Sequence, residues 1–182
     1  ARFWEDIVSL IYFPVVRSVA TAPGREPTQN ARLLAVAAQA IDDAFIAVFD
    51  AKYHYNFWRP ITAIRNGDID GNDATEREAS WLPFIDTPMH PEYPCAHCIS
   101  AAAIGAVLQA ELGTGPTPTL STTSLTAPGM VRRWTKLGDF VQEVANARIY
   151  DGVHYRNSTE VGSAMGKQIG ELAAAKSLRP LK

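Results

Sequence analysis

The stretch HPEYPCAHC, residues 90–98, places histidines and cysteines close together before an alanine-rich run. Cys95 and Cys98, three residues apart at a predicted helix start, have the form of a thiol–disulfide oxidoreductase site. The same cysteines with His97 could bind zinc, but no fourth ligand with the usual spacing is evident. His97 could instead face an anion, because free N–H groups at a helix start favour negative charge.

Cationic residues elsewhere in the chain favour the interpretation as an anion site. Lys52 and Arg59 are seven residues apart, which returns them to nearly the same face of a helix. Arg148 and His154 are six apart, and Gly152 offers a helix end between them that lets His154 turn back. The sequence therefore predicts one pocket for a phosphate-like oxyanion, built from the ends of three helices.

The elements that must position these residues are mostly helical, with little sign of strand. Residues 1–20 have a helical apolar pattern that Pro14 interrupts. Further helices are expected at about 30–58, 97–112, 128–152 and 158–176. Residues 66–96 and 113–129, rich in proline, glycine or threonine, are expected to be long loops. We expect an all-α helical bundle with long loops.

The final helix has a predicted N-terminal cap. Asn157 or Ser158 would cap the helix, and Glu160 is placed to return a hydrogen bond. The cap also offers a purely structural reason for the serine at position 158.

Composition bounds the class of protein. A chain of 182 residues, 47% hydrophobic and 20% charged, can bury one core, so residues 1–182 are expected to form a single helical domain. The net charge of −2 gives no general attraction to nucleic acid or anionic membrane. The apolar runs are too short or too charged to span a bilayer. Ala1 in place of methionine suggests a processed product or a fragment, with a secreted or periplasmic location favoured.

Three motifs follow one another along the chain. KYHYNFWRP fits K-x6-R-P, PCAH stands where a P-S-G-H motif would, and RIYDGVH fits R-x5-H. Together they resemble the signature of the vanadium-dependent haloperoxidases and of the related type-2 phosphatidic acid phosphatases (PAP2 superfamily) and bacterial acid phosphatases. The resemblance covers about residues 28–176. Known haloperoxidases are longer, which implies that this chain is the site-bearing C-terminal part of a longer architecture.

The resemblance implies a role for each matching residue. Lys52, Arg59 and Arg148 would neutralise the oxygens of bound vanadate, or of phosphate in the same site. His154 would be the axial ligand of vanadium, or the nucleophile that forms a phosphohistidine. His97 would be the general acid/base.

The resemblance also implies substrates. Bromide-oxidising members have a histidine at the position of His90, so we expect a haloperoxidase that uses hydrogen peroxide and halide, with bromide favoured. The alternatives are an acid phosphatase acting on a small phosphoester and a non-catalytic oxyanion-binding domain. Self-association, or association with an N-terminal portion, is expected.

Three positions depart from the family pattern. Cys95 stands for the serine that would hydrogen-bond the oxyanion, and Ala96 for the glycine whose N–H approaches it. Ser158 stands for the aspartate four residues after His154, which predicts that this histidine lacks a carboxylate partner. We also expect Cys95 and Cys98 to be joined in a disulfide, or Cys95 to be shielded by the bound anion.

Overall fold

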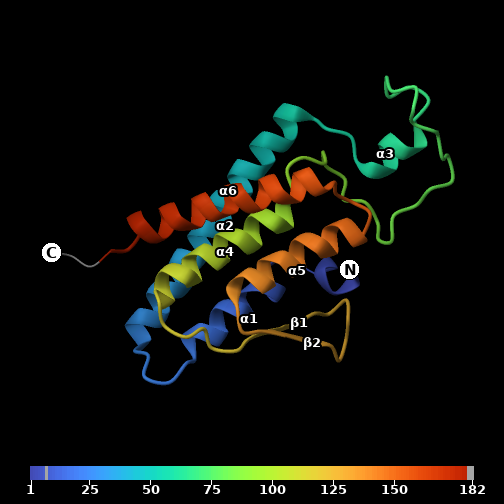
Figure 1. Cartoon of the computed structure of the whole chain (residues 1–182). Coiled ribbons are helices and arrows are strands. Elements are labelled where there is room, and N and C mark those ends of the chain that lie inside the picture. The colour runs from blue at the N-terminus through green and yellow to red at the C-terminus, as the bar shows by residue number, and fades with distance from the viewer. Residues whose placement is uncertain (7, 180–182) are drawn as a thin grey trace.

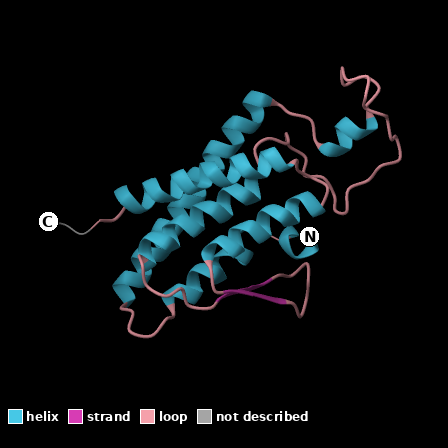
Figure 2. Ribbon diagram, viewed as in Figure 1, coloured by secondary structure: helices cyan, strands magenta, loops and turns pink. Residues whose placement is uncertain are grey.

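The computed structural model describes residues 1–6 and 8–179 as a helical bundle with one small hairpin (Figures 1 and 2). The prediction of a mainly helical fold is confirmed. The elements in chain order are η1 (Arg2–Glu5), α1 (Val8–Ala20), α2 (Pro27–Tyr55), α3 (Pro60–Arg65), α4 (Ala96–Leu112), β1 (Leu120–Thr123), β2 (Val131–Trp134), α5 (Leu137–Tyr150) and α6 (Arg156–Lys176).

Helix α4 lies at the centre of the bundle. It packs against α6, α2, α5 and α1, and Figure 1 shows it between these helices. Its residues are mostly alanine and other small or aliphatic types, and nearly the whole helix is buried. Small side chains on every face let several helices approach α4 at once, which explains its weak amphipathic pattern. The central helix therefore holds its first turn, with His97, at a fixed place inside the bundle.

A row of glycines brings α6 against α4. Gly162, Gly166 and Gly170 are spaced four apart and face α4. A Cβ at Gly162 would lie 2.7 Å from the carbonyl oxygen of Cys95, so a larger residue would force the helices apart. Cys95 N–H also donates to Ser158 O at 3.2 Å. These contacts place the beginnings of α4 and α6 side by side.

The helix expected at 128–152 begins later, and part of it is a strand. Leu120–Thr123 and Val131–Trp134 pair antiparallel, with Leu120 opposite Trp134. The threonine-rich first strand and the exposed–buried alternation of the second suit a half-buried hairpin better than a helix. The prediction of helix for residues 128–136 was therefore wrong, and α5 starts at Leu137.

Two helix ends also differ from expectation. Helix α2 ends at Tyr55, because Asn56 adopts a left-handed conformation (φ 46°) and its N–H bonds to Lys52 O. Helix α6 begins at Arg156 with Tyr155 as its N-cap, so Asn157 and Ser158 lie inside the first turn. The predicted cap was therefore wrong, and the Ser158 hydroxyl contacts His154 instead.

A long connection joins α2 to α4. It contains the short helix α3, which projects from the bundle at the upper right of Figure 1, and then runs back to the beginning of α4. Its return is fixed by backbone bonds from Glu92 N–H to Phe57 O and from Phe84 N–H to Asp151 O. The loop thus carries His90 and Glu92 into the bundle. Among the helices that the structure describes, none has the length and apolar character needed to cross a bilayer.

Candidate functional site

The three motifs converge in one buried cluster. Lys52 lies in the last turn of α2, Arg59 directly before α3, and His97 in the first turn of α4. Arg148 lies in the last turn of α5, and His154 follows in the turn before α6. Burial lowers the pKa values of both histidines well below the usual range, and the charges of the three cations lower them further. Both imidazoles are therefore neutral at neutral pH.

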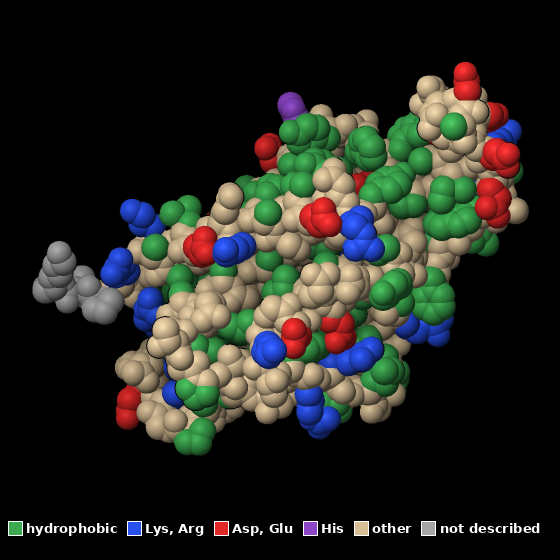
Figure 3. All heavy atoms as spheres, in the orientation of Figure 1, with side chains coloured by type: hydrophobic (Ala, Val, Ile, Leu, Met, Phe, Trp, Pro, Cys, Tyr) green, Lys and Arg blue, Asp and Glu red, His purple; other side chains and the backbone are tan. Residues whose placement is uncertain are grey.

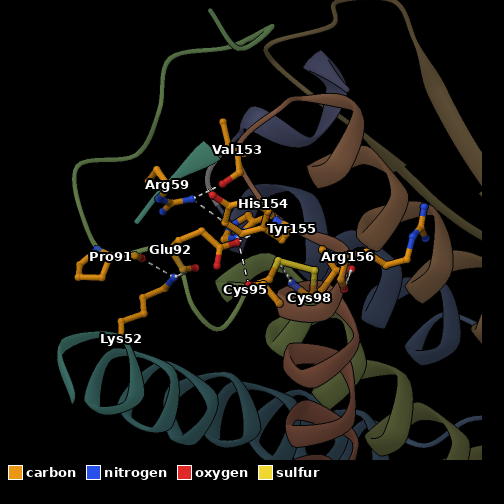
Figure 4. A network of polar contacts seen from close by, with 12 residues as sticks. Lys52, Arg59, Pro91, Glu92, Cys95, Cys98, Val153, His154, Tyr155 and Arg156 are labelled. Atoms are coloured by element: carbon orange, nitrogen blue, oxygen red, sulfur yellow. Dashed lines mark hydrogen bonds and ion pairs between the residues drawn. A yellow bond between two sulfur atoms is a disulfide. The ribbon is translucent and has the colours of Figure 1, made fainter. Parts of the chain in front are cut away.

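Arg59 ties the loops of the cluster together. Its guanidinium is buried, with Nε donating to His90 O (3.0 Å) and one terminal nitrogen donating to Val153 O (2.7 Å). The same terminal nitrogen lies 3.2 Å from His154 Nε2 (Figure 4). Burial lowers the pKa of Arg59 to about 10, so the side chain stays charged at neutral pH.

Lys52 is fully buried at the edge of the same cluster. Its Nζ donates to Pro91 O (2.9 Å) and Glu92 O (2.8 Å), as Figure 4 shows. The pKa of Lys52 is lowered to about 7, mainly by burial and then by the charge of Arg59. The charge of Glu92 acts in the opposite direction. The site therefore holds a lysine that titrates near neutral pH.

This pKa predicts how anion affinity depends on pH. Sulfate keeps the same charge between pH 6 and 9, so any change in its affinity reports on the protein. Above about pH 7 the free site has a neutral Lys52, and binding sulfate must restore its proton. Sulfate affinity is therefore expected to be flat below pH 7 and to fall by up to about tenfold per pH unit above it. Calorimetric titration at several pH values measures this profile.

Lys52→Met is expected to bind sulfate more weakly at pH 6 and to lose the pH dependence. Lys167→Met is the matched control, because Lys167 is an exposed lysine paired with Glu171. A wild-type profile that stays flat to pH 9 would show that Lys52 does not contact the anion.

Arg148 and His97 each leave a buried nitrogen without a partner. One terminal nitrogen of Arg148 donates to Asp151 Oδ2 (2.9 Å) and to Trp4 O (3.3 Å). Among the described residues, neither Arg148 Nε nor His97 Nε2 has a hydrogen-bond partner. Burial lowers the pKa of Arg148, and the charge of Asp151 opposes that change. Unpartnered buried nitrogens cost free energy unless a ligand satisfies them.

The protonation of His154 follows from its two neighbours. Arginine can only donate, so His154 Nε2 accepts from Arg59 and carries a lone pair. Nδ1 lies 2.7 Å from Glu92 Oε1 and donates its proton there. A carboxylate on one nitrogen fixes the ring and raises the electron density at the other. His154 thus presents a basic nitrogen to the cation cluster.

Glu92 is the functional residue that sequence reasoning missed. It is fully buried, and its Oε1 also accepts from the Tyr155 N–H at 3.0 Å, at the start of α6. Ser158 lies 3.4 Å from His154 Nδ1, so the carboxylate expected at position 158 comes from Glu92 instead. The expectation that His154 lacks a carboxylate partner was wrong. The signal was the glutamate within HPEYP, two residues after His90.

Cys95 and Cys98 form a disulfide in the first turn of α4, with Cα atoms 5.3 Å apart (Figure 4). Both cysteines are fully buried, and Cys95 Sγ accepts from Cys98 N–H at 3.2 Å. A disulfide sulfur has no proton, so Cys95 cannot replace the family's serine as a donor to an oxyanion. The helix geometry still leaves the N–H groups of Ala96 and His97 without intrahelical partners.

His90 lies against Arg59 at the edge of the cluster. Its Nδ1 is 3.1 Å from a terminal nitrogen of Arg59 and 3.2 Å from Pro91 O. The two contacts require opposite roles of Nδ1, because arginine can only donate and a carbonyl oxygen can only accept. Burial and the nearby charge of Lys52 lower the pKa of His90 to about 4, so a neutral imidazole stands beside the cations.

Known proteins share this fold. Residues 32–182 match the model of the VCPO second helical-bundle domain. A bacterial vanadium-dependent iodoperoxidase structure superposes with a TM-score of 0.77, at 28% identity over 91% of this chain. The apo form of a bacterial vanadium-dependent chloroperoxidase superposes with a TM-score of 0.72, at 18% identity over 90% of this chain. No curated protein sequence matches this chain.

The chain spans 38% of the iodoperoxidase chain and 40% of the chloroperoxidase chain. The match to the family model covers most of the present sequence and includes every residue of the cluster. This chain therefore belongs to the vanadium-dependent haloperoxidase superfamily, within which it matches the second helical-bundle domain.

Proposed function

We propose that the cluster binds vanadate and oxidises halide with hydrogen peroxide, with bromide as the favoured halide. The observation that carries the proposal is the orientation of His154. Glu92 holds Nδ1, so the Nε2 lone pair faces the Arg59 guanidinium in a buried site. An electron-rich nitrogen beside a cation would suit a ligand to the central atom of a bound oxyanion.

The residues present fit an oxyanion. Three buried cations have lowered pKa values because burial outweighs the charges of Glu92 and Asp151. Among the described residues, His97 Nε2 and Arg148 Nε have no hydrogen-bond partner, so they add two groups that could bind an anion. A bound anion would supply both countercharge and acceptors. Within residues 1–6 and 8–179, no group of three or more His, Cys, Asp or Glu could hold a metal cation.

Vanadate would be held by Lys52, Arg59 and Arg148, with His154 Nε2 as the nitrogen that would bind vanadium. When bound, it would supply a Lewis-acidic centre that activates hydrogen peroxide toward halide. Phosphate, with the same shape and charge, fits the same groups.

The overall reaction consumes a proton, because hydrogen peroxide, bromide and a proton give hypobromous acid and water. His97 Nε2 is the buried nitrogen available to carry that proton. An anion bound nearby favours the protonated imidazole, which raises the pKa of His97 from its lowered value in the free site. His97 can then accept a proton from solvent and return it during turnover.

The favoured halide rests on His90. Its neutral ring lies next to the positive charge of Arg59, where a halide anion would be favoured. The similar solved structures include both an iodoperoxidase and a chloroperoxidase. Iodide, bromide and chloride should therefore be compared in one assay.

The test is halide oxidation by the purified chain with vanadate and hydrogen peroxide. We expect bromide and iodide to be oxidised, and His154→Ala to reduce the rate by about 100-fold or more. His54→Ala is the matched control, because His54 is an exposed histidine on α2. Equal rates for the two variants would contradict the proposal.

A phosphatase using His154 as nucleophile is the second candidate, because the lone pair on Nε2 suits attack on phosphorus equally well. A phosphatase would hydrolyse p-nitrophenyl phosphate, would be inhibited by vanadate and would accumulate phosphate on His154. Oxyanion binding with neither activity would indicate a non-catalytic domain.

A further inference from the structure

A second cavity lies beside the cluster, at the end of α2. Its volume is about 890 Å³, and it is bounded by the α2–α3 connection, the loop around residue 70 and the first turn of α6. Figure 3 shows hydrophobic side chains gathered in this region, where α2 ends and α3 projects from the bundle. The cavity is lined by Glu92 but by none of the three cations of the oxyanion site.

Aromatic rings form most of the wall. Tyr55 meets Tyr93 edge to face at 5.2 Å, and Phe57 meets Tyr155 edge to face at 5.9 Å. Trp58, 43% exposed, adds a fifth ring. The faces of such rings carry partial negative charge and attract cations.

Both charged residues that line the cavity are acidic, and the cations Lys52 and Arg59, which act on Glu92, do not line it. Asp70 and Glu92 line the cavity, whereas no lysine or arginine does. Helix α2 also ends here at Asn56, so the negative end of its dipole points to the cavity. The positive, N-terminal end of α6 also lies at the cavity, but the Tyr155 N–H there already donates to Glu92 Oε1.

Glu92 supplies an unused acceptor. Its Oε1 binds His154 and Tyr155, while its Oε2 is buried and has no partner among the described residues. Figure 4 shows the side chain between these groups. A ligand with N–H donors would reach Oε2 only if the side chain or the cavity wall shifted, because solvent does not reach this atom in the structure.

We propose that this cavity binds a small organic ammonium ion, with its charge toward Glu92 and its apolar part against the aromatic rings. A neutral ligand of the same shape would keep the apolar contact but lose the attraction to the rings and carboxylates. Binding can be observed without vanadate or turnover, although the two sites share Glu92.

The test is calorimetric titration with 2-phenylethylammonium and with 2-phenylethanol, its neutral analogue. We expect the ammonium ion to bind about tenfold more tightly. Trp58→Leu should weaken ammonium binding several-fold and leave sulfate binding unchanged. Tyr53→Leu is the matched control, because Tyr53 is an exposed aromatic residue near the end of α2 that does not line the cavity.

Circular dichroism establishes that both variants remain folded. Equal affinity for the two compounds would overturn the proposal, as would no binding of either at millimolar concentration. Equal loss in Trp58→Leu and Tyr53→Leu would also overturn it. Sulfate binding measured on the same samples separates this outcome from a failure of the oxyanion site.

Discussion

Arg59→Ala is expected to weaken sulfate or vanadate binding by about 100-fold or more, because it removes one partner from a buried, charge-assisted contact. The guanidinium is 5% exposed and lies 3.2 Å from His154 Nε2, where the anion would be held. Losing this charge also removes repulsion on Lys52, so the pKa of Lys52 should rise from about 7. The decline in sulfate affinity with pH should then begin at a higher pH than in the parent protein.

Arg59 also holds the backbone at His90 and Val153, so loop movement is a second route by which the variant would lose affinity. Arg59→Lys separates the two effects, since lysine keeps the charge but cannot make the fork of hydrogen bonds. We expect Arg59→Lys to recover only part of the affinity. Arg77→Ala is the control, because Arg77 is an exposed arginine paired with Asp68 at 3.5 Å. Calorimetry showing parent-like affinity in Arg59→Ala would refute the site.

The helices could be predicted where local pattern and packing agree. The long amphipathic run of α2 and the alanine-rich run of α4 were placed within a few residues of their observed bounds. The hairpin at 120–134 was not predicted, because each strand is four residues long and depends on its partner. The end of α2 was placed too late, since Asn56 ends the helix before Pro60 can.

The cations of the site could be predicted from motif spacing because the chain keeps the order Lys52, Arg59, Arg148. The carboxylate could not, because Glu92 and His154 are 62 residues apart and meet only through the fold. Ser158 lies beside the ring of His154, but a serine there does not indicate which other residue supplies the carboxylate. The carboxylate partner of His154 thus comes from the loop before α4 and not from α6.

The same contacts revise what restoring the family residues would do. From sequence alone, Ser158→Asp restores a missing partner to His154. In the structure that partner is present, and a second carboxylate would lie beside Glu92 in a buried site. Burial already raises the pKa of Glu92, and another negative charge would raise it further. Ser158→Asp by itself is therefore expected to bring no gain in vanadate affinity.

Glu92→Gln is expected to lower vanadate affinity by about 10-fold to 100-fold, as is typical when a ligand histidine loses its carboxylate partner. Glutamine has an amide N–H₂ that can donate to His154 Nδ1, which would move the ring proton to Nε2 and oppose Arg59. Adding Ser158→Asp to Glu92→Gln should recover much of the affinity, because the new carboxylate would again accept the Nδ1 proton. Vanadate titration of the two single variants and the double variant measures this loss and recovery of affinity.

A structural role alone would not control which nitrogen carries the proton. Nitrogen-15 chemical shifts of His154 should therefore show a proton on Nδ1 in the parent protein and in the double variant, and a mixture or the other form in Glu92→Gln. Glu171→Gln, at an exposed position on α6, is the matched control and should leave both the affinity and these shifts unchanged. If the double variant binds vanadate no better than Glu92→Gln, the carboxylate does not act through His154, and the role assigned to Glu92 fails.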